Sequence, residues 1–113
     1  MTTTAEASEV AAAGDLDLAV TDELETLLRR ELRLAPPALV FDASEVTFCG
    51  ARVLTILLNT AADARRLGVP FALAGRRRAL LRPIAALGLE QALPVQWSTA
   101  EALAWFALVP RLT

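Results

Sequence analysis

Apolar and polar positions along this chain alternate between short apolar runs and longer stretches with helical spacing. Three short apolar runs, at 38–41, 69–74 and 95–97, are typical of strands that are covered on both faces. Residues 9–18 predict a further strand, which Gly14 interrupts or ends. The pattern therefore predicts four short strands along the chain.

The longest helical patterns lie before and after the 38–41 run. Leucines at helical spacing predict a first helix, which Thr21 or Asp22 caps and which Pro36 ends. The most regular pattern predicts a second helix over 51–67, with Gly68 as its carboxyl-terminal stop. Each of these helices follows a predicted strand.

Two shorter helices complete the pattern. One is expected over 79–87, where Pro83 either begins a short helix or kinks a longer one. The other begins at the capping-box pattern of Ser98 and Glu101 and continues to about Leu108. The predicted order is strand and helix in strict alternation, which indicates an α/β fold with a largely parallel sheet.

Length and composition fit one domain. The chain has 113 residues, 55% of them hydrophobic, which is enough for a single packed core. We expect a disordered segment over 1–8, a folded domain over 9–108 and a tail over 109–113. The longest uncharged stretch, 53–62, is too short for a membrane span, and no secretion signal opens the chain. We therefore expect a cytoplasmic protein.

The residue types disfavour several kinds of chemistry. The chain has no His, Lys or Tyr, and all eleven basic residues are Arg. It therefore lacks the commonest general base and the commonest metal ligand. No metal is expected, because carboxylates alone would have to form its site and none cluster, and no cofactor is expected, because no glycine-rich phosphate loop occurs. These absences favour a binding protein over an enzyme.

Charge is unevenly distributed along the sequence. Residues 1–49 hold ten acidic residues and three Arg, whereas residues 50–113 hold three acidic residues and eight Arg. The densest basic cluster is Arg76 to Arg78 with Arg82, but few aromatic residues are available to stack on bases. We expect this cluster to be solvated or to contact an acidic protein, and we do not expect nucleic-acid binding.

Three segments together resemble the STAS domain family of bacterial anti-sigma factor antagonists. They are the Gly-Asp-Leu-Asp sequence at 14–17, the apolar run and Asp-Ala-Ser-Glu-Val-Thr-Phe sequence over 40–48, and the Gly-Leu at 88–89 followed by Leu-Pro-Val at 93–95. The resemblance covers roughly residues 9–106. It implies a STAS (SpoIIAA-like) fold, a small parallel or mixed sheet of four to five strands with about four helices against it.

The resemblance also implies a non-enzymatic switch module that docks on an anti-sigma factor kinase. In this family a Ser or Thr after the central strand is phosphorylated, and the phosphate blocks docking. This chain departs from that motif, because Gly50 stands for the Asp, Ala51 for the first Ser and Arg52 for the acceptor. No hydroxyl lies between Phe48 and Thr55, so phosphorylation at the family position is chemically excluded.

Arg52 is a notable residue because a helix amino terminus favours anions over cations. Three environments are possible for its guanidinium group. It could pair with Asp17, Asp42 or Glu45, it could contact an acidic surface of a partner protein, or it could extend into solvent. The candidate partner-binding residues are Asp17, Ser44, Glu45, Gly50, Ala51 and Arg52.

Other candidates have plainer interpretations. Asp42 lacks an obvious second titratable group, so a turn or cap role is favoured over catalysis, and Ser44 is interpreted as a turn residue. Cys49 is expected to be a small buried hydrophobe, with a redox role left open. Of Trp105 and Phe106, we expect one in the core and one free to cover an interface.

Two functions of different classes follow from the sequence. The leading hypothesis is an antagonist-like regulator that binds an anti-sigma factor or related kinase-fold partner and is insensitive to phosphorylation at the family position. The alternative is a STAS scaffold subunit of an ABC-transporter or stress-signalling complex. An enzyme is the weakest hypothesis. A homodimer stays open, because a short first strand would leave a sheet edge exposed.

Overall fold

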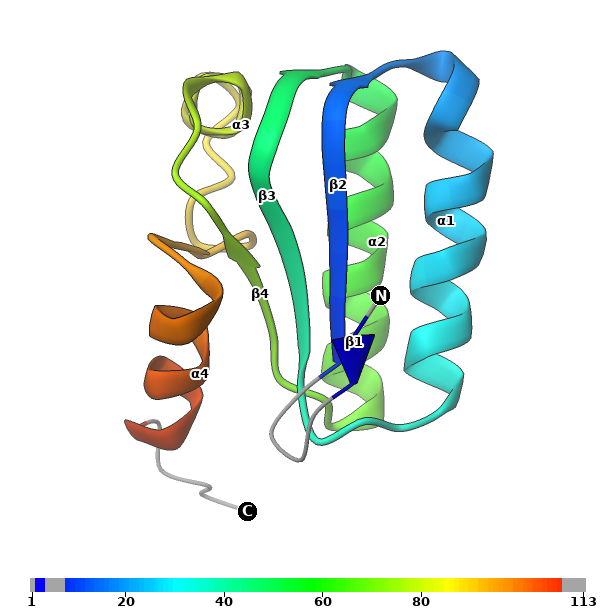
Figure 1. The fold of residues 1–113 in the computed structure, drawn as a ribbon, viewed down its shortest axis with the longest axis vertical. Helices are drawn as coiled ribbons and strands as arrows, with labels where there is room; N and C mark the ends of the chain where they lie inside the picture. Colours follow the sequence, from blue (N-terminus) through cyan, green and yellow to red (C-terminus); the bar gives the residue numbers. More distant parts are fainter. Residues whose placement is uncertain (1, 4–7, 109–113) are drawn as a thin grey trace.

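Over the residues that the structure describes, the fold is a five-stranded sheet with four helices (Figure 1). The computed structural model describes residues 2–3 and 8–108. In chain order the elements are β1 (Thr2–Thr3), β2 (Ser8–Leu16), α1 (Leu18–Arg33), β3 (Leu39–Cys49), α2 (Ala51–Leu67), β4 (Phe71–Ala74), α3 (Arg78–Ala86), β5 (Val95–Gln96) and α4 (Thr99–Leu108). The strands lie side by side in sequence order; β1 is antiparallel to β2 and the other neighbours are parallel. This confirms the predicted α/β fold class.

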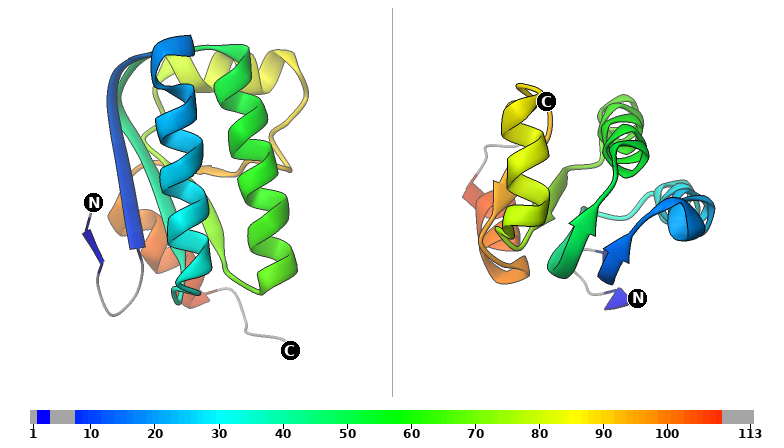
Figure 2. Two further views of the ribbon diagram at one scale, coloured as in Figure 1. Left: turned by 90° about the vertical axis from the view of Figure 1, so that its right-hand side faces the viewer. Right: turned by 90° about the horizontal axis from the view of Figure 1, so that it is seen from above.

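The helices cover the sheet unequally (Figures 1 and 2). Helices α1 and α2 lie side by side on one face, α4 lies on the opposite face, and α3 crosses the end of the sheet where β3 finishes. Alternation along β3 explains the two cores: Leu39 and Phe41 belong to the large core with α1, α2 and α3, whereas Val40 belongs to a small core with Ala72 and Ala102. Burial on both faces accounts for the apolar β3 sequence.

Helix α2 has the bounds that the sequence predicts. It ends at Gly68, whose φ of 71° is left-handed and whose N–H donates to the carbonyl of Arg65. Leu54 and Leu57 are buried as expected, but Leu67, also expected to face the core, is 59% exposed because the helix ends there. The Ser98 half of the predicted capping box is confirmed as well, since the Ser98 hydroxyl accepts from the Glu101 N–H at 3.1 Å.

Two boundaries differ from the prediction. Helix α1 begins at Leu18, three residues before the expected cap, because the Asp17 carboxylate accepts from the Ala19 N–H at 3.0 Å and serves as the N-cap. Strand β3 continues to Cys49 instead of ending at Phe41, because β2 pairs with it along its whole length. Ser44, interpreted as a turn residue, therefore lies within a strand, and the Asp42 carboxylate accepts from the Ser44 N–H there at 3.0 Å.

The two ends of the chain are described only in part. Of the predicted disordered segment 1–8, residues 2–3 form β1 and Ser8 begins β2, while residues 1 and 4–7 lie outside the described residues. The predicted tail 109–113 also lies outside them, as do the side chains of Trp105 and Phe106. No helix within the described ranges is long and apolar enough to cross a membrane.

Candidate partner-binding site at the carboxyl end of the sheet

The candidate site lies where β2 and β3 end and where α1 and α2 begin, at the top of Figure 1. Gly50 is the N-cap of α2, and no side chain caps that helix. The Gly50 N–H donates to the Leu16 carbonyl at 3.0 Å, and the Gly50 carbonyl accepts from the Val53 N–H at 3.1 Å. The first of these bonds holds the β3–α2 junction against the end of β2, and the second begins α2.

The Arg52 side chain reaches across this end of the sheet to α1. Its Nη2 lies 3.5 Å from Oδ1 of Asp22, and the two side chains are 55% and 92% exposed. Asp22 is none of the three acids expected from the sequence. Because α1 begins earlier than predicted, Asp22 lies on its second turn, beside the first turn of α2. A pair this exposed contributes only about 0–1 kcal/mol and can exchange partners readily.

A hollow of about 260 Å³ opens beside this ion pair. Its lining residues are Leu16, Asp17, Thr21, Phe48, Gly50, Ala51, Arg52 and Val53. Four of the six predicted site residues thus meet here. The sequence prediction did not include Phe48, which is 53% exposed. The sequence feature that could have identified Phe48 is a large aromatic residue near the end of a strand that leads directly into the predicted binding turn.

Ser44 and Glu45 are not part of this hollow. They lie within β3, roughly 16–20 Å before Gly50 at the rise of an extended strand. The Ser44 N–H donates to Oδ1 of Asp42 at 3.0 Å, and Glu45 pairs in register with Ala13 of β2. These two residues belong to the sheet near the β4–α3 turn, so the structure divides the predicted set.

The hydroxyl and thiol groups near the junction are occupied or buried. Thr47 donates to Oδ1 of Asp15 at 2.6 Å, which ties β3 to β2, and Thr55 donates to the Ala51 carbonyl at 3.3 Å. Burial raises the pKa of the Cys49 thiol from 9.0 to about 11. The thiolate, which is the reactive form, is therefore scarce at neutral pH.

The arginine cluster forms a separate surface at the start of α3. The Arg76 guanidinium lies 5.0 Å from the Trp97 ring centroid and donates to the Val95 carbonyl at 3.1 Å. Arg78 and Arg82 line a shallow hollow of about 500 Å³ nearby. Among the described residues no group of His, Cys, Asp and Glu side chains is arranged to hold a metal ion.

Comparisons with known proteins place this geometry in a family. The family model described as "Mlab, STAS domain" matches residues 1–96. A similar solved structure is an anti-sigma factor antagonist from Mycobacterium paratuberculosis, with 33% identity and a TM-score of 0.78 over 88% of this chain and 85% of that one. No curated protein sequence gives a significant match.

Two more distant structures share the fold. One is a sulfate transporter family protein from Wolinella succinogenes, with 19% identity and a TM-score of 0.78 over 96% of this chain and 90% of that one. The other is the anti-sigma factor antagonist SpoIIAA in its unphosphorylated form, with 12% identity and a TM-score of 0.79 over 95% and 93% of the two chains. The chain therefore belongs to the STAS domain family and resembles its anti-sigma factor antagonists.

Proposed function

We propose that this protein is a non-enzymatic cytoplasmic regulator that binds an anti-sigma factor or a related kinase-fold protein. Family membership and the 33% identical anti-sigma factor antagonist support the class of partner. The residue types support a binding role, since the chain has no His, Lys or Tyr for acid–base or nucleophilic chemistry.

The observation that carries the proposal is the combination of an apolar hollow with an exchangeable ion pair. Leu16, Phe48 and Val53 give the hollow apolar walls, and Arg52 lies at its rim. An acidic group of a partner can take Asp22's place beside Arg52 at little cost, because that pair is solvent-exposed in the free protein. We infer that the partner inserts an apolar side chain next to a carboxylate.

We do not propose control by a phosphate at this turn. The chain has no Ser, Thr or Tyr between Phe48 and Thr55, and Arg52 occupies the place of the family's acceptor. A buried Cys49 with a raised pKa also makes a poor redox switch. We propose instead control by the concentration of the protein and by exchange between partners.

The test is the affinity of the purified protein for an anti-sigma factor from the same genome, measured by calorimetry. Arg52→Glu places a carboxylate at the rim and should weaken binding by roughly tenfold or more. Arg65→Glu makes the same charge change on an exposed residue in the last turn of α2 and should leave the affinity unchanged. Equal affinities for the wild type and Arg52→Glu would contradict this site.

A second variant tests the apolar part of the site. Phe48→Ala removes a ring that is 53% exposed, so it should cost little stability while it weakens binding. Circular dichroism and a melting curve show whether the variant is folded. Unchanged binding by a folded Phe48→Ala protein would mean that the partner docks elsewhere.

The alternative function is a scaffold subunit of an ABC-transporter or stress-signalling complex. The lack of an acceptor hydroxyl at the start of α2 favours it, because a permanent subunit needs no phosphate-driven release. Co-purification from native extract separates the two: a transporter ATPase or a large signalling assembly supports the scaffold, and an anti-sigma factor supports the regulator.

A further inference from the structure

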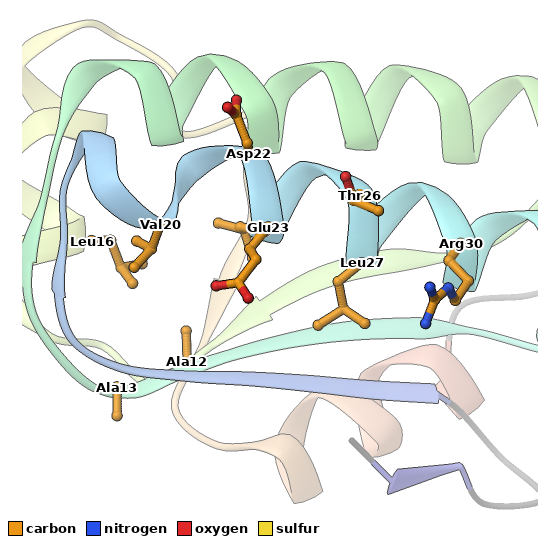
Figure 3. Close-up of a pocket in the computed structure, with 10 residues that line it drawn as sticks. Ala12, Ala13, Leu16, Val20, Asp22, Glu23, Thr26, Leu27 and Arg30 are labelled. Carbon is orange, nitrogen blue, oxygen red and sulfur yellow. The ribbon is translucent and has the colours of Figure 1, made fainter.

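A groove of about 730 Å³ runs along α1 beside the outer edge of β2 (Figure 3). Strand β1 pairs only with Ser8 and Glu9, so within the described part of the chain the rest of this edge has no strand neighbour. Ala12 and Ala13 of β2 line the groove with small side chains, which leaves space for a partner element. One end of this groove adjoins the hollow at the α2 amino terminus, because Leu16 lines both and Asp22, the partner of Arg52, lines the groove.

The wall of the groove formed by α1 carries a regular stripe of side chains. Val20, Glu23, Leu27 and Arg30 line it, and Figure 3 shows them along the side of α1 that faces β2. Their spacing of three and four residues continues to Leu34, which is 68% exposed. Val20, Leu27 and the C-cap residue Leu34 recur every seven residues, with the charged Glu23 and Arg30 between them, and Val20 and Leu27 also pack partly against the protein's own core. An exposed row of this spacing can also contact a second helix.

The stripe on one copy of α1 is complementary to the same stripe on a second copy that runs in the opposite direction. In an antiparallel pair with Leu27 facing Leu27, Val20 of one copy meets Leu34 of the other, and Glu23 meets Arg30. Each match is within one residue, or about 1.5 Å of helix rise. In the described structure neither Glu23 nor Arg30 takes part in an ion pair. Both charges are therefore available for a contact across a two-fold axis.

The strand edge itself is a poor alternative docking element. Gly14 has a φ of 77°, and the register of β2 against β3 shifts between Ala11 and Ala13 and again between Gly14 and Asp15. The extra residue at each shift lies on β3, whereas the left-handed Gly14 interrupts the extended backbone of β2 itself and hinders extension of this edge by another strand. A helix does not need a straight edge, so it suits the groove better than a strand does.

We propose that a second copy of this chain docks in the groove with its own α1, antiparallel to the first, to form a two-fold symmetric dimer. Such an interface is isologous, so the Glu23–Arg30 contact occurs twice. The dimer contact to be tested rests on Glu23 and Arg30, neither of which lines the hollow at the α2 terminus.

Sedimentation velocity of the full chain over a wide concentration range tests the dimer. The wild type should show a concentration-dependent dimer. Glu23→Arg and Arg30→Glu should each weaken dimerisation by about tenfold, because two attractive contacts become repulsive. Arg65→Glu and Glu90→Arg reverse exposed charges outside the groove and serve as matched controls.

Mixing the two variants gives the decisive result. The Glu23→Arg variant carries two arginines on its stripe and the Arg30→Glu variant carries two glutamates, so both contacts across the axis of a mixed dimer are attractive. An equimolar mixture of the two variants should therefore recover the wild-type dimer. A wild type that stays monomeric throughout would overturn the proposal. So would dimers that both variants leave unchanged, or variants whose mixture fails to recover them.

Discussion

Replacing Glu31 with leucine should stabilise the protein. Glu31 lies on α1 with 0% of its surface exposed, and neither carboxylate oxygen has a hydrogen-bond partner among the described residues. It occupies the inward face of the helix between Leu28 and Leu32, both of which belong to the large core. Burying such a group without partners is unfavourable, and leucine has a similar size without the polar atoms.

The gain in stability is estimated from the smallest cost that burying the Glu31 side chain can have. A neutral polar group buried without a hydrogen bond costs about 1–3 kcal/mol, and a buried unpaired charge costs more. Glu31→Leu should therefore raise the free energy of unfolding by about 1–3 kcal/mol, or the melting temperature by roughly 4 °C or more in a domain of this size. Glu31→Gln removes the charge but keeps two polar atoms, so it should gain less.

Urea unfolding followed by circular dichroism measures the effect. Glu90→Leu, at an exposed position, is the matched control and should change stability by less than about 0.5 kcal/mol. If Glu31→Leu lowers the free energy of unfolding, then the carboxylate makes a stabilising contact with the rest of the chain, and the reasoning from its missing partners is refuted.

Two further predictions concern the ends of the strands. Gly75→Ala should destabilise the protein by about 2 kcal/mol or more in urea unfolding, because Gly75 has a φ of 90° and an added Cβ would lie 2.6 Å from the Ser44 backbone; an unchanged unfolding midpoint would contradict this close approach. The raised pKa of Cys49 predicts that iodoacetamide modifies the native protein about 100-fold more slowly than the unfolded chain at pH 8, with a rate that rises up to about pH 11. Since the native state holds the thiol proton more tightly, the stability that this group contributes is present below about pH 9 and is lost as pH rises to about 11. Equal labelling rates in mass spectrometry would show that the thiol is accessible and ionises normally.

The sequence predicted the features that depend on neighbouring residues. The bounds of α2, the stop at Gly68 and the cap at Ser98 were all predicted, because each rests on contacts within about one helical turn. The alternation of apolar runs and helical patterns was enough to predict the α/β class. Residue identity alone excluded a phosphate between Phe48 and Thr55.

The tertiary structure determined the features that depend on distant segments. The sequence from Asp42 to Ser44 favours a turn locally, but pairing with β2 keeps β3 extended to Cys49. Arg52 meets Asp22, thirty residues earlier in the chain, because α1 begins at Leu18 and lies beside α2. Local patterns carry no information about which helices become neighbours, since that depends on how the sheet and its helices pack. Packing therefore divided the predicted site, leaving Ser44 and Glu45 in the sheet and joining Asp17, Gly50, Ala51 and Arg52 around one hollow.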